Sequence, residues 1–216
     1  YQDLTGIPIE AGASSAFSLI NAGSGFARVF PNTLANDGTG YNYGLELTIQ
    51  RYFNKNWHAL FTGCVYNSKY TPSDGVERNT SFNGLYAANF LAGKEFDVGK
   101  NKILGLGIKV TGAGGKRKGL IDPIASADQG EVIFKDEGFN EAKFKDYFRF
   151  DIKTTYKINK EKVTHEIGVD FVNLSGAENI LNYSYAPNND GIANEDDIVL
   201  NYQLGFLPIF YYRIDF

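Results

Sequence analysis

The chain has 216 residues and a formal net charge of -4, with acidic and basic residues intermixed along its length. This balance gives no basic footprint for nucleic acid, and the single cysteine, Cys64, excludes an internal disulfide and a thiolate-rich metal site. No run of about 18 apolar residues is present, so a transmembrane helix is not expected. The sequence contains no Met and no signal peptide, which leads us to expect a processed or partial chain.

Apolar and polar residues alternate with a period of two along most of the chain, a pattern that predicts β-strands. In the first clear example, Leu45, Leu47 and Ile49 alternate with Glu46 and Thr48. Most segments exceed the roughly 5–6 residues of an ordinary strand and reach the roughly 9–11 residues that a tilted strand needs to cross a bilayer. The predicted strands cover residues 41–53, 56–69, 84–97, 102–112, 146–158, 162–173 and 207–216.

The connections between these segments alternate in length. The short polar turns are residues 53–56, 97–102 and 158–162. The long irregular stretches are residues 1–40, 70–83, 112–145 and 173–206. Outer-membrane barrels have short periplasmic turns, long extracellular loops and aromatic belts near both strand ends. We therefore predict an all-β fold, an antiparallel transmembrane β-barrel segment of about seven long strands, with a soluble β-sandwich adhesin or lectin as an alternative.

The polar face of the predicted strands is too charged for a dry core, because buried charges without partners are strongly unfavourable. In a barrel this face would line a water-filled lumen. The candidate lumen-facing residues are Glu46, Arg149, Asp151, Lys153, Glu166 and Asp170.

The last residues, "FYYRIDF", form a strand that ends the sequence on an aromatic side chain. Tyr211, Arg213 and Asp215 are expected to face the lumen. The opposite set is expected to face lipid and comprises Phe210, Tyr212, Ile214 and Phe216.

Several stretches together resemble the C-terminal part of the β-barrel of TonB-dependent outer-membrane receptors, in the form common in Bacteroidota. The residues that carry the resemblance are "FSLINAG" (17–23), "GTGYNYGLELTIQRYF" (38–53), "YNSKYTPSDGVERNTSFNG" (66–84), "NFLAGKEF" (89–96), "DYFRFDIKTTYKINKEKVTHEIGVDFVNL" (146–174) and "FYYRIDF" (210–216). One departure is residues 112–123, where Lys116 and Arg117 stand in place of an Arg pair and no Tyr follows.

The resemblance implies that residues 1–216 are the last strands of a barrel of about twenty-two strands, whose plug domain and earlier strands are absent. Such a receptor takes up a nutrient, such as a siderophore, glycan or peptide, across the outer membrane of a Gram-negative bacterium. The implied partners are the rest of the barrel and plug, the TonB–ExbB–ExbD system, a surface lipoprotein lid, and lipid or lipopolysaccharide. The lumen-facing charges would line the transport path or hold the plug.

The resemblance also gives the terminal residues a role. The set Phe210, Tyr212, Ile214 and Phe216 resembles the signal that the barrel-assembly machinery recognises in such proteins. The chain could alternatively be a client or component of an outer-membrane assembly or secretion complex.

No catalytic constellation is present, so we expect no enzyme and no cofactor. His58 and His165 lie inside predicted strands, where structural or interfacial roles are expected. The glycines of residues 105–119 match no phosphate-binding template and instead favour a bend or exit from the sheet.

Residues 188–197 form an acidic loop. Its oxygen-bearing side chains make a weak calcium candidate in place of a solvated loop: Asn188, Asp190, Glu195, Asp196 and Asp197. The basic cluster of Lys116, Arg117 and Lys118 is expected to be solvated, with anionic headgroups or an acidic ligand as the alternative contact.

Overall fold

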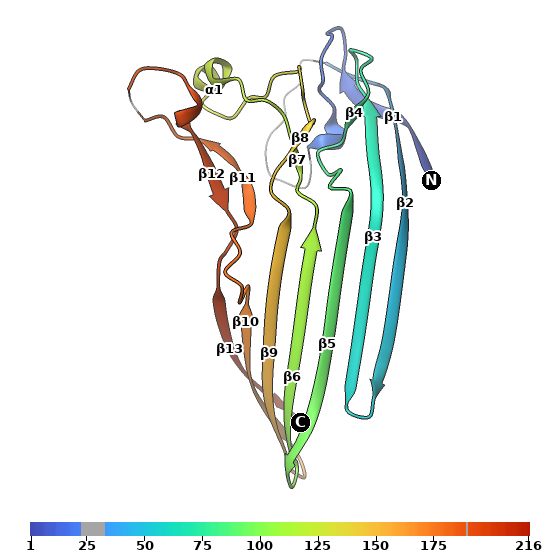
Figure 1. Ribbon diagram of the computed structural model, residues 1–216, viewed down its shortest axis with the longest axis vertical. Helices are drawn as coiled ribbons and strands as arrows, with labels where there is room; N and C mark the ends of the chain where they lie inside the picture. Colours follow the sequence, from blue (N-terminus) through green and yellow to red (C-terminus); the bar gives the residue numbers. More distant parts are fainter. Residues whose placement is uncertain (23–32, 189) are drawn as a thin grey trace.

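The structure is a computed structural model that describes residues 1–22, 33–188 and 190–216, and its main feature is one antiparallel sheet. Eight strands follow one another in the order β1-β2-β3-β5-β6-β9-β10-β13, and the short β4 (Arg78–Asn79) pairs with β3, which gives nine strands in all (Figure 1). The strands of the path are β1 (Gln2–Glu10), β2 (Leu34–Asn54), β3 (Trp57–Thr71), β5 (Tyr86–Gly99), β6 (Lys102–Ala113), β9 (Tyr147–Asn159), β10 (Thr164–Val172) and β13 (Leu207–Asp215).

The prediction of an all-β, antiparallel fold is confirmed. The count of seven long strands is wrong, because the path contains eight, and β1 lies in a stretch that we expected to be irregular. Gly6, at φ 70, and two register shifts interrupt the alternation of β1 and hide its period. Pairing with β1 also extends β2 back to Leu34, past Asp37 and Gly38, which are usually strand breakers. The described residues form no closed barrel, since β1 and β13 lie at opposite ends of the strand order.

The remaining elements lie at the long-loop end of the sheet, opposite the short turns (Figure 1). Two stretches predicted as irregular contain a hairpin and a helix. The hairpin pairs β11 with β12, and the helix α1 starts at Pro123 behind the N-cap Asp122 and ends before Gly130. The elements are η1 (Leu19–Asn21), β7 (Arg117–Lys118), α1 (Pro123–Gln129), β8 (Ala142–Lys143), β11 (Ile180–Tyr185), η2 (Glu195–Asp197) and β12 (Ile198–Tyr202).

The strand register separates the side chains into two faces, because residues directly opposite each other in a sheet point to the same side. Leu45 lies opposite Val65, and Val65 lies opposite Tyr86. The same face continues through β6, β9, β10 and β13, and we call it the outer face. Its apolar side chains include Leu45, Leu47, Ile49, Phe61, Val65, Phe90, Leu106, Ile108, Phe148, Ile152, Ile167 and Phe210.

The outer face is open to its surroundings. Leu45 is 78% exposed and Phe210 is 72% exposed. Isolated exposed apolar residues are common on protein surfaces, but here they form one continuous apolar face. No helix among the described residues is long and apolar enough to cross a membrane.

Polar hydrogen bonds hold the long-loop end together. The amide of Asn140, a residue with φ 62, donates to the carbonyl oxygen of Asn79 at 2.9 Å. Asn83 donates to Asn79 Oδ1 at 2.8 Å, and the backbone N–H of Ser81 donates to Asn21 Oδ1 at 2.8 Å. Segments far apart in the sequence are thereby joined above the strands.

The inner face at this end is covered by residues 15–21. The buried Tyr70 donates its hydroxyl hydrogen to the carbonyl oxygen of Ala16 at 2.8 Å. Nearby, Arg78 and Asp74 form a salt bridge of 2.6 Å between largely buried side chains. The hydrogen bond from Arg78 lowers the pKa of Asp74 and the same pairing raises the pKa of Arg78. This pairing stabilises the loop between β3 and β5.

Candidate functional site: the charged inner face

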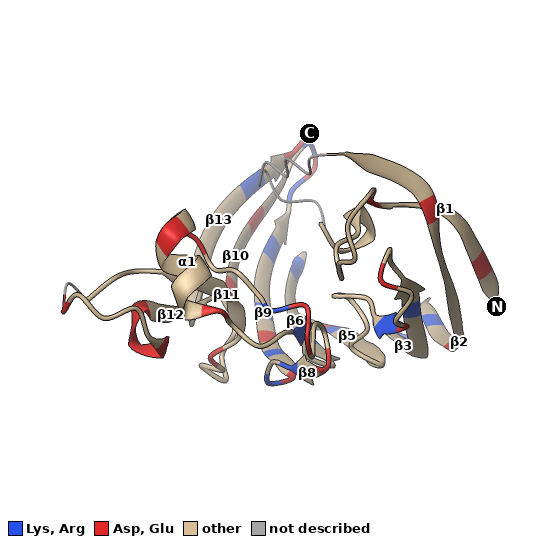
Figure 2. Cartoon of the chain, turned by 90° about the horizontal axis from the view of Figure 1, so that it is seen from above, with Lys and Arg blue, Asp and Glu red and all other residues tan. Residues whose placement is uncertain are grey.

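The inner face carries a concave site of about 520 Å³ that spans six strands of the sheet. Viewed from above, the strands stand along an open arc, with Lys, Arg, Asp and Glu on several of them (Figure 2). The site is lined by charged side chains, glycines and some apolar residues such as Leu91 and Val172 from β5, β6, β9, β10 and β13, with His58 from β3. We call it the inner-face site.

Glycines form the floor of the inner-face site. Gly93 of β5 and Gly107 of β6 lie directly opposite each other, and the next position of β6 on this face is Gly105. The ring of His58 covers Gly93, whereas a Cβ on Gly107 would meet no atom closer than Lys153 Cβ at 3.6 Å. Of these three glycines, Gly107 therefore has the most free space above it.

Glu166 lies at the centre of an ion-pair network on the rim. Its side chain is 5% exposed and accepts hydrogen bonds from Tyr211 Oη at 2.7 Å and Arg213 Nη2 at 3.2 Å. Lys157 Nζ lies 3.7 Å from Glu166 and 2.9 Å from Glu95. A buried carboxylate is stable only with such partners. The network therefore explains how Glu166 can be buried within β10.

Two further pairs continue the rim. Arg149 donates to both carboxylate oxygens of Asp151, which also accepts the backbone N–H of Asn173 at 2.8 Å. Lys153 lies 3.5 Å from Asp170 and over the ring of Tyr211 at 4.6 Å from its centroid. Lys109 faces Asp151 in register but forms no salt bridge among the described residues. The rim thus presents both charges, with most groups neutralised in pairs.

The structure brings together five of the six residues predicted to face the lumen, namely Arg149, Asp151, Lys153, Glu166 and Asp170. Glu46 is on the same face but lies apart, exposed on β2. Glu95 was not predicted, and His58 was expected in a structural or interfacial role but not assigned to the lumen-facing side, because β3 and β5 alternate weakly. Their positions follow from the β3–β5 register, in which His58 lies opposite Gly93.

The terminal residues predicted to face lipid lie on the outer face. Phe210 is opposite Val169, Tyr212 is opposite Ile167, and Ile214 is opposite His165. Phe216 is 99% exposed. His165 also lies on the outer face, where its Nδ1 is 2.7 Å from Tyr212 Oη and the two rings are stacked.

In the acidic loop of residues 188–197, carboxylates accept hydrogen bonds from backbone N–H groups of the same loop. Asp197 is buried and accepts the N–H of Asn188 at 3.0 Å and of Asn194 at 3.3 Å. Asp190 accepts the N–H of Ile192 at 2.7 Å. Across residues 1–22, 33–188 and 190–216, no group of three or more His, Cys, Asp or Glu residues is placed to hold a metal ion. The calcium candidate therefore gains no support from the geometry.

The basic cluster of the loop is only partly solvated. Lys116 is exposed, as expected. Arg117 instead donates to the carbonyl oxygens of Asn83 and Glu141, both at 2.9 Å. Lys118 donates to Tyr183 Oη at 2.9 Å. The expectation of a solvated cluster is therefore wrong for Arg117 and Lys118, because their side chains donate hydrogen bonds to loop carbonyl oxygens and to the hydroxyl of Tyr183.

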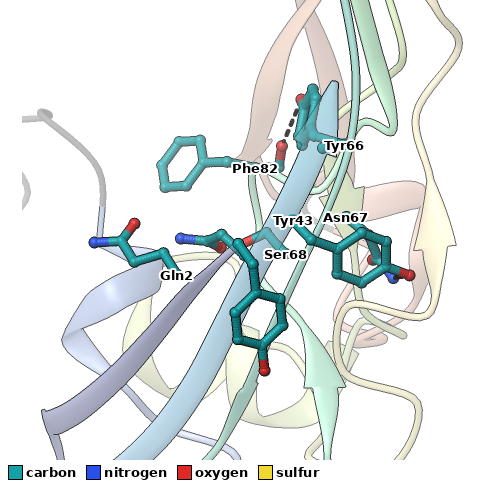
Figure 3. A pocket seen from close by; sticks show the side chains of 9 residues that line it. Gln2, Tyr43, Tyr66, Asn67, Ser68 and Phe82 are labelled. Atoms are coloured by element: carbon teal, nitrogen blue, oxygen red, sulfur yellow. Dashed lines mark hydrogen bonds between the residues drawn. The ribbon is translucent and has the colours of Figure 1, made fainter. Parts of the chain in front are cut away.

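A second concave site of about 450 Å³ lies at the edge of β2 near the start of β1 (Figure 3). Its lining is aromatic and amide-bearing. Tyr66 donates to the carbonyl oxygen of Phe82 at 3.0 Å, and Asn67 donates to Tyr43 Oη at 2.9 Å. It has no charged side chain among its lining residues, so it differs in chemistry from the inner-face site.

Comparison of the chain with protein-family models, with curated proteins and with solved structures found no match. The functional argument therefore depends on the two faces of the sheet and on the inner-face site.

Proposed function

We propose that this chain is the C-terminal part of the β-barrel of a TonB-dependent outer-membrane receptor that takes up a nutrient across the outer membrane. The observation that carries the proposal is the separation of an open apolar face from a charged concave face across long antiparallel strands. Lipid requires an apolar outer wall, and a lumen tolerates charge because it holds water.

The connections support the same proposal. The β2–β3 turn is short and tight, with Lys55 at φ 53 and Asn56 at φ 63, the left-handed geometry that favours two-residue hairpins. The β5–β6 and β9–β10 turns are also short. The other connections between strands of the path are long, and their described parts lie at the opposite end (Figure 1). In the proposed orientation the long loops lie outside the cell and capture the nutrient.

The inner-face site has a stated role in this proposal. Its paired charges keep the lumen wall hydrated and rigid, and they provide hydrogen-bond partners for a plug or a passing solute. No residue in the site is proposed to perform chemistry. The plug, the earlier strands and the contact with TonB are expected from parts of the receptor outside this sequence.

The geometry is less favourable to a β-sandwich. Such a fold packs two sheets face to face about 10 Å apart. Among the described residues the other two sheets are two-stranded, β7 with β8 and β11 with β12, and lie at the loop end. Neither contains enough strands to cover the outer face.

Adjacent positions on β2 provide a matched test. Leu47 lies on the outer face opposite Gly63, and Thr48 lies on the inner face opposite Thr62. Lys on the lipid face near the midplane costs about 2–4 kcal/mol. In the full-length protein, Leu47→Lys should therefore strongly reduce the heat-resistant form in outer-membrane fractions, and Thr48→Lys should not.

A physiological test completes the proposal. Deletion of the receptor or of TonB should abolish uptake of the same nutrient. If the full-length protein stays folded and monodisperse in buffer without detergent, or if both substitutions behave alike, the membrane assignment is wrong.

A further inference from the structure

Charge is distributed unevenly over the outer face. We consider the part of the outer face between the Tyr41–Lys69 pair, near the long loops, and the short turns. The described positions in this part include no Asp or Glu. They include three permanently charged basic residues, Arg51, Lys94 and Lys102. We call these three the basic rim.

The basic rim lies at the short-turn end of the apolar face. Arg51 precedes the β2–β3 turn, Lys94 lies opposite Trp57 at the start of β3, and Lys102 begins β6 directly after the β5–β6 turn. The turns add further positive charge, since Lys55, Lys100, Lys160 and Lys162 outnumber Glu161. The strand carboxylates at the same end, such as Glu95 and Asp215, belong to the inner face.

Aromatic rings accompany the basic side chains. The Arg51 guanidinium carbon lies 3.9 Å from the centroid of the Trp57 ring, and Lys94 Nζ lies 5.1 Å from that of Phe96. Trp57 is directly opposite Lys94 across the β3–β5 pair. Amphipathic rings of this kind sit well at headgroup depth, where long basic side chains reach toward the interface.

The basic rim has no anionic partner within the described chain. None of its members forms a salt bridge with a described carboxylate, although nine such contacts occur elsewhere. Arg51 Nε is in addition buried without a hydrogen-bond acceptor among the described residues. Unpaired cations beside an apolar face are complementary to a ligand that joins an anionic group to hydrocarbon chains.

We infer that the basic rim binds the phosphate groups of anionic glycerophospholipids at the membrane surface, an inference that rests on the proposed function. Each Lys or Arg near an anionic surface favours the anionic lipid by roughly fivefold. A free phosphate ion would gain the charge contact but nothing from the neighbouring Trp57 and Phe96, so the lipid is the favoured occupant.

Trp57, the single tryptophan of the sequence, reports on lipid at the rim. The full-length protein is reconstituted in phosphatidylcholine bilayers containing brominated phosphatidylglycerol or, separately, brominated phosphatidylcholine at the same fraction. Subtracting the signal of Trp57→Phe isolates Trp57. We expect several-fold stronger quenching by brominated phosphatidylglycerol, and we expect added salt to reduce the difference.

Variants then test whether the preference for phosphatidylglycerol depends on the basic rim. R51Q/K94Q/K102Q should remove the difference between the two lipids, and the charge-retaining R51K/K94R/K102R should keep it. Lys109→Gln, on the inner face of β6, is the matched control and should leave it unchanged. Single Lys94→Gln and Lys102→Gln variants, each expected to reduce the preference, replace the triple variant if that does not fold.

The outcomes separate the inference from the proposed function. Equal quenching by the two lipids, or a preference that survives in the triple Gln variant, overturns lipid binding by the rim while leaving a membrane location intact. Loss of the preference on adding inorganic phosphate at constant ionic strength overturns it in favour of a free phosphate site. Absence of quenching by either lipid contradicts the membrane location itself.

Discussion

The ring of Tyr211 lies over Gly168, its direct neighbour across the β10–β13 pair. A Cβ at position 168 would overlap the ring, so only glycine leaves Tyr211 room to donate its hydroxyl hydrogen to Glu166 at 2.7 Å. This contact joins the last strand of the sheet to the inner-face ion-pair network.

Gly168→Ala should therefore displace Tyr211 and lower the free energy of unfolding by about 1–3 kcal/mol, the usual effect of overfilling a packed site. Gly107→Ala is the matched control, since a Cβ there would make only ordinary van der Waals contacts, the nearest with Lys153 Cβ at 3.6 Å. Urea unfolding of the full-length protein in detergent, followed by tyrosine fluorescence, measures both. Equal stability of the two variants would contradict the packing argument.

Glu166→Ala removes the common partner of Lys157, Tyr211 and Arg213. Lys157 keeps its contact with Glu95 and Arg213 keeps its contact with Asp215, so the expected loss of about 1–3 kcal/mol comes mainly from leaving Tyr211 Oη without its acceptor. Glu46→Ala should have little effect, since Glu46 is exposed and forms no salt bridge among the described residues. Under the proposed function, the heat-modifiable mobility of the full-length protein on gels checks both variants. A thermal shift of similar size in each would show that position 166 is not special.

Much of the sheet could be predicted because its side chains repeat every second residue. In β9 the run from Phe148 to Ile158 places apolar and polar groups on opposite faces with Thr154 as the one exception, and the structure has the same strand. β1 could not be predicted in this way, since Gly6 and two register shifts break its period. Its strand conformation depends on pairing with β2, which local sequence does not reveal.

The sequence predicted on which face of the sheet the site residues lie, but not which side chains they contact. Alternation alone placed Arg149, Asp151 and Lys153 on one side of β9. It did not predict that Glu166 would bind three side chains from two neighbouring strands. Such contacts depend on the stagger between strands, which the sequence of one strand does not determine. The same reason explains why the inner-face positions of Glu95 and His58 were not predicted.

The loop between β3 and β5 should be sensitive to acid. Because the folded-state pKa of Asp74 is lowered by its hydrogen bond to Arg78, the pairing stabilises the loop above the ordinary pKa of 3.8. That contribution is lost as the pH falls below 3.8 through the lowered folded-state pKa. The protection of residues 72–85 against hydrogen exchange, taken relative to the intrinsic rate at each pH, should therefore fall in this acidic range. Asp74→Asn should exchange faster at neutral pH and lose the acid dependence, whereas unchanged exchange in Asp74→Asn would refute the role of the pair.

Lys118 should hold the β11–β12 hairpin against the neighbouring loop. It donates to Tyr183 Oη and lies 5.3 Å and 5.5 Å from the centroids of the Phe144 and Tyr183 rings. Lys118→Met keeps the length of the side chain but removes a cation–π contact of about 0.5–2 kcal/mol. We expect faster hydrogen exchange in residues 180–185 and 198–202. Lys116→Met, at an exposed position two residues away, should leave it unchanged, and protection that persists in Lys118→Met would exclude the contact as the anchor.

The terminal aromatic residue should matter for assembly rather than for the stability of the described sheet. Phe216 is 99% exposed and follows the last paired residue of β13, Asp215. Because it has so few contacts within the chain, Phe216→Asp should change the unfolding of assembled protein very little. Under the proposed function it should nevertheless lower surface levels, because it places a charge in the lipid-facing set of Phe210, Tyr212, Ile214 and Phe216. Phe216→Tyr and the inner-facing Asp215→Asn should assemble normally, and quantitative surface labelling compares the three variants. Normal surface levels of Phe216→Asp would rule out a role for Phe216 in assembly.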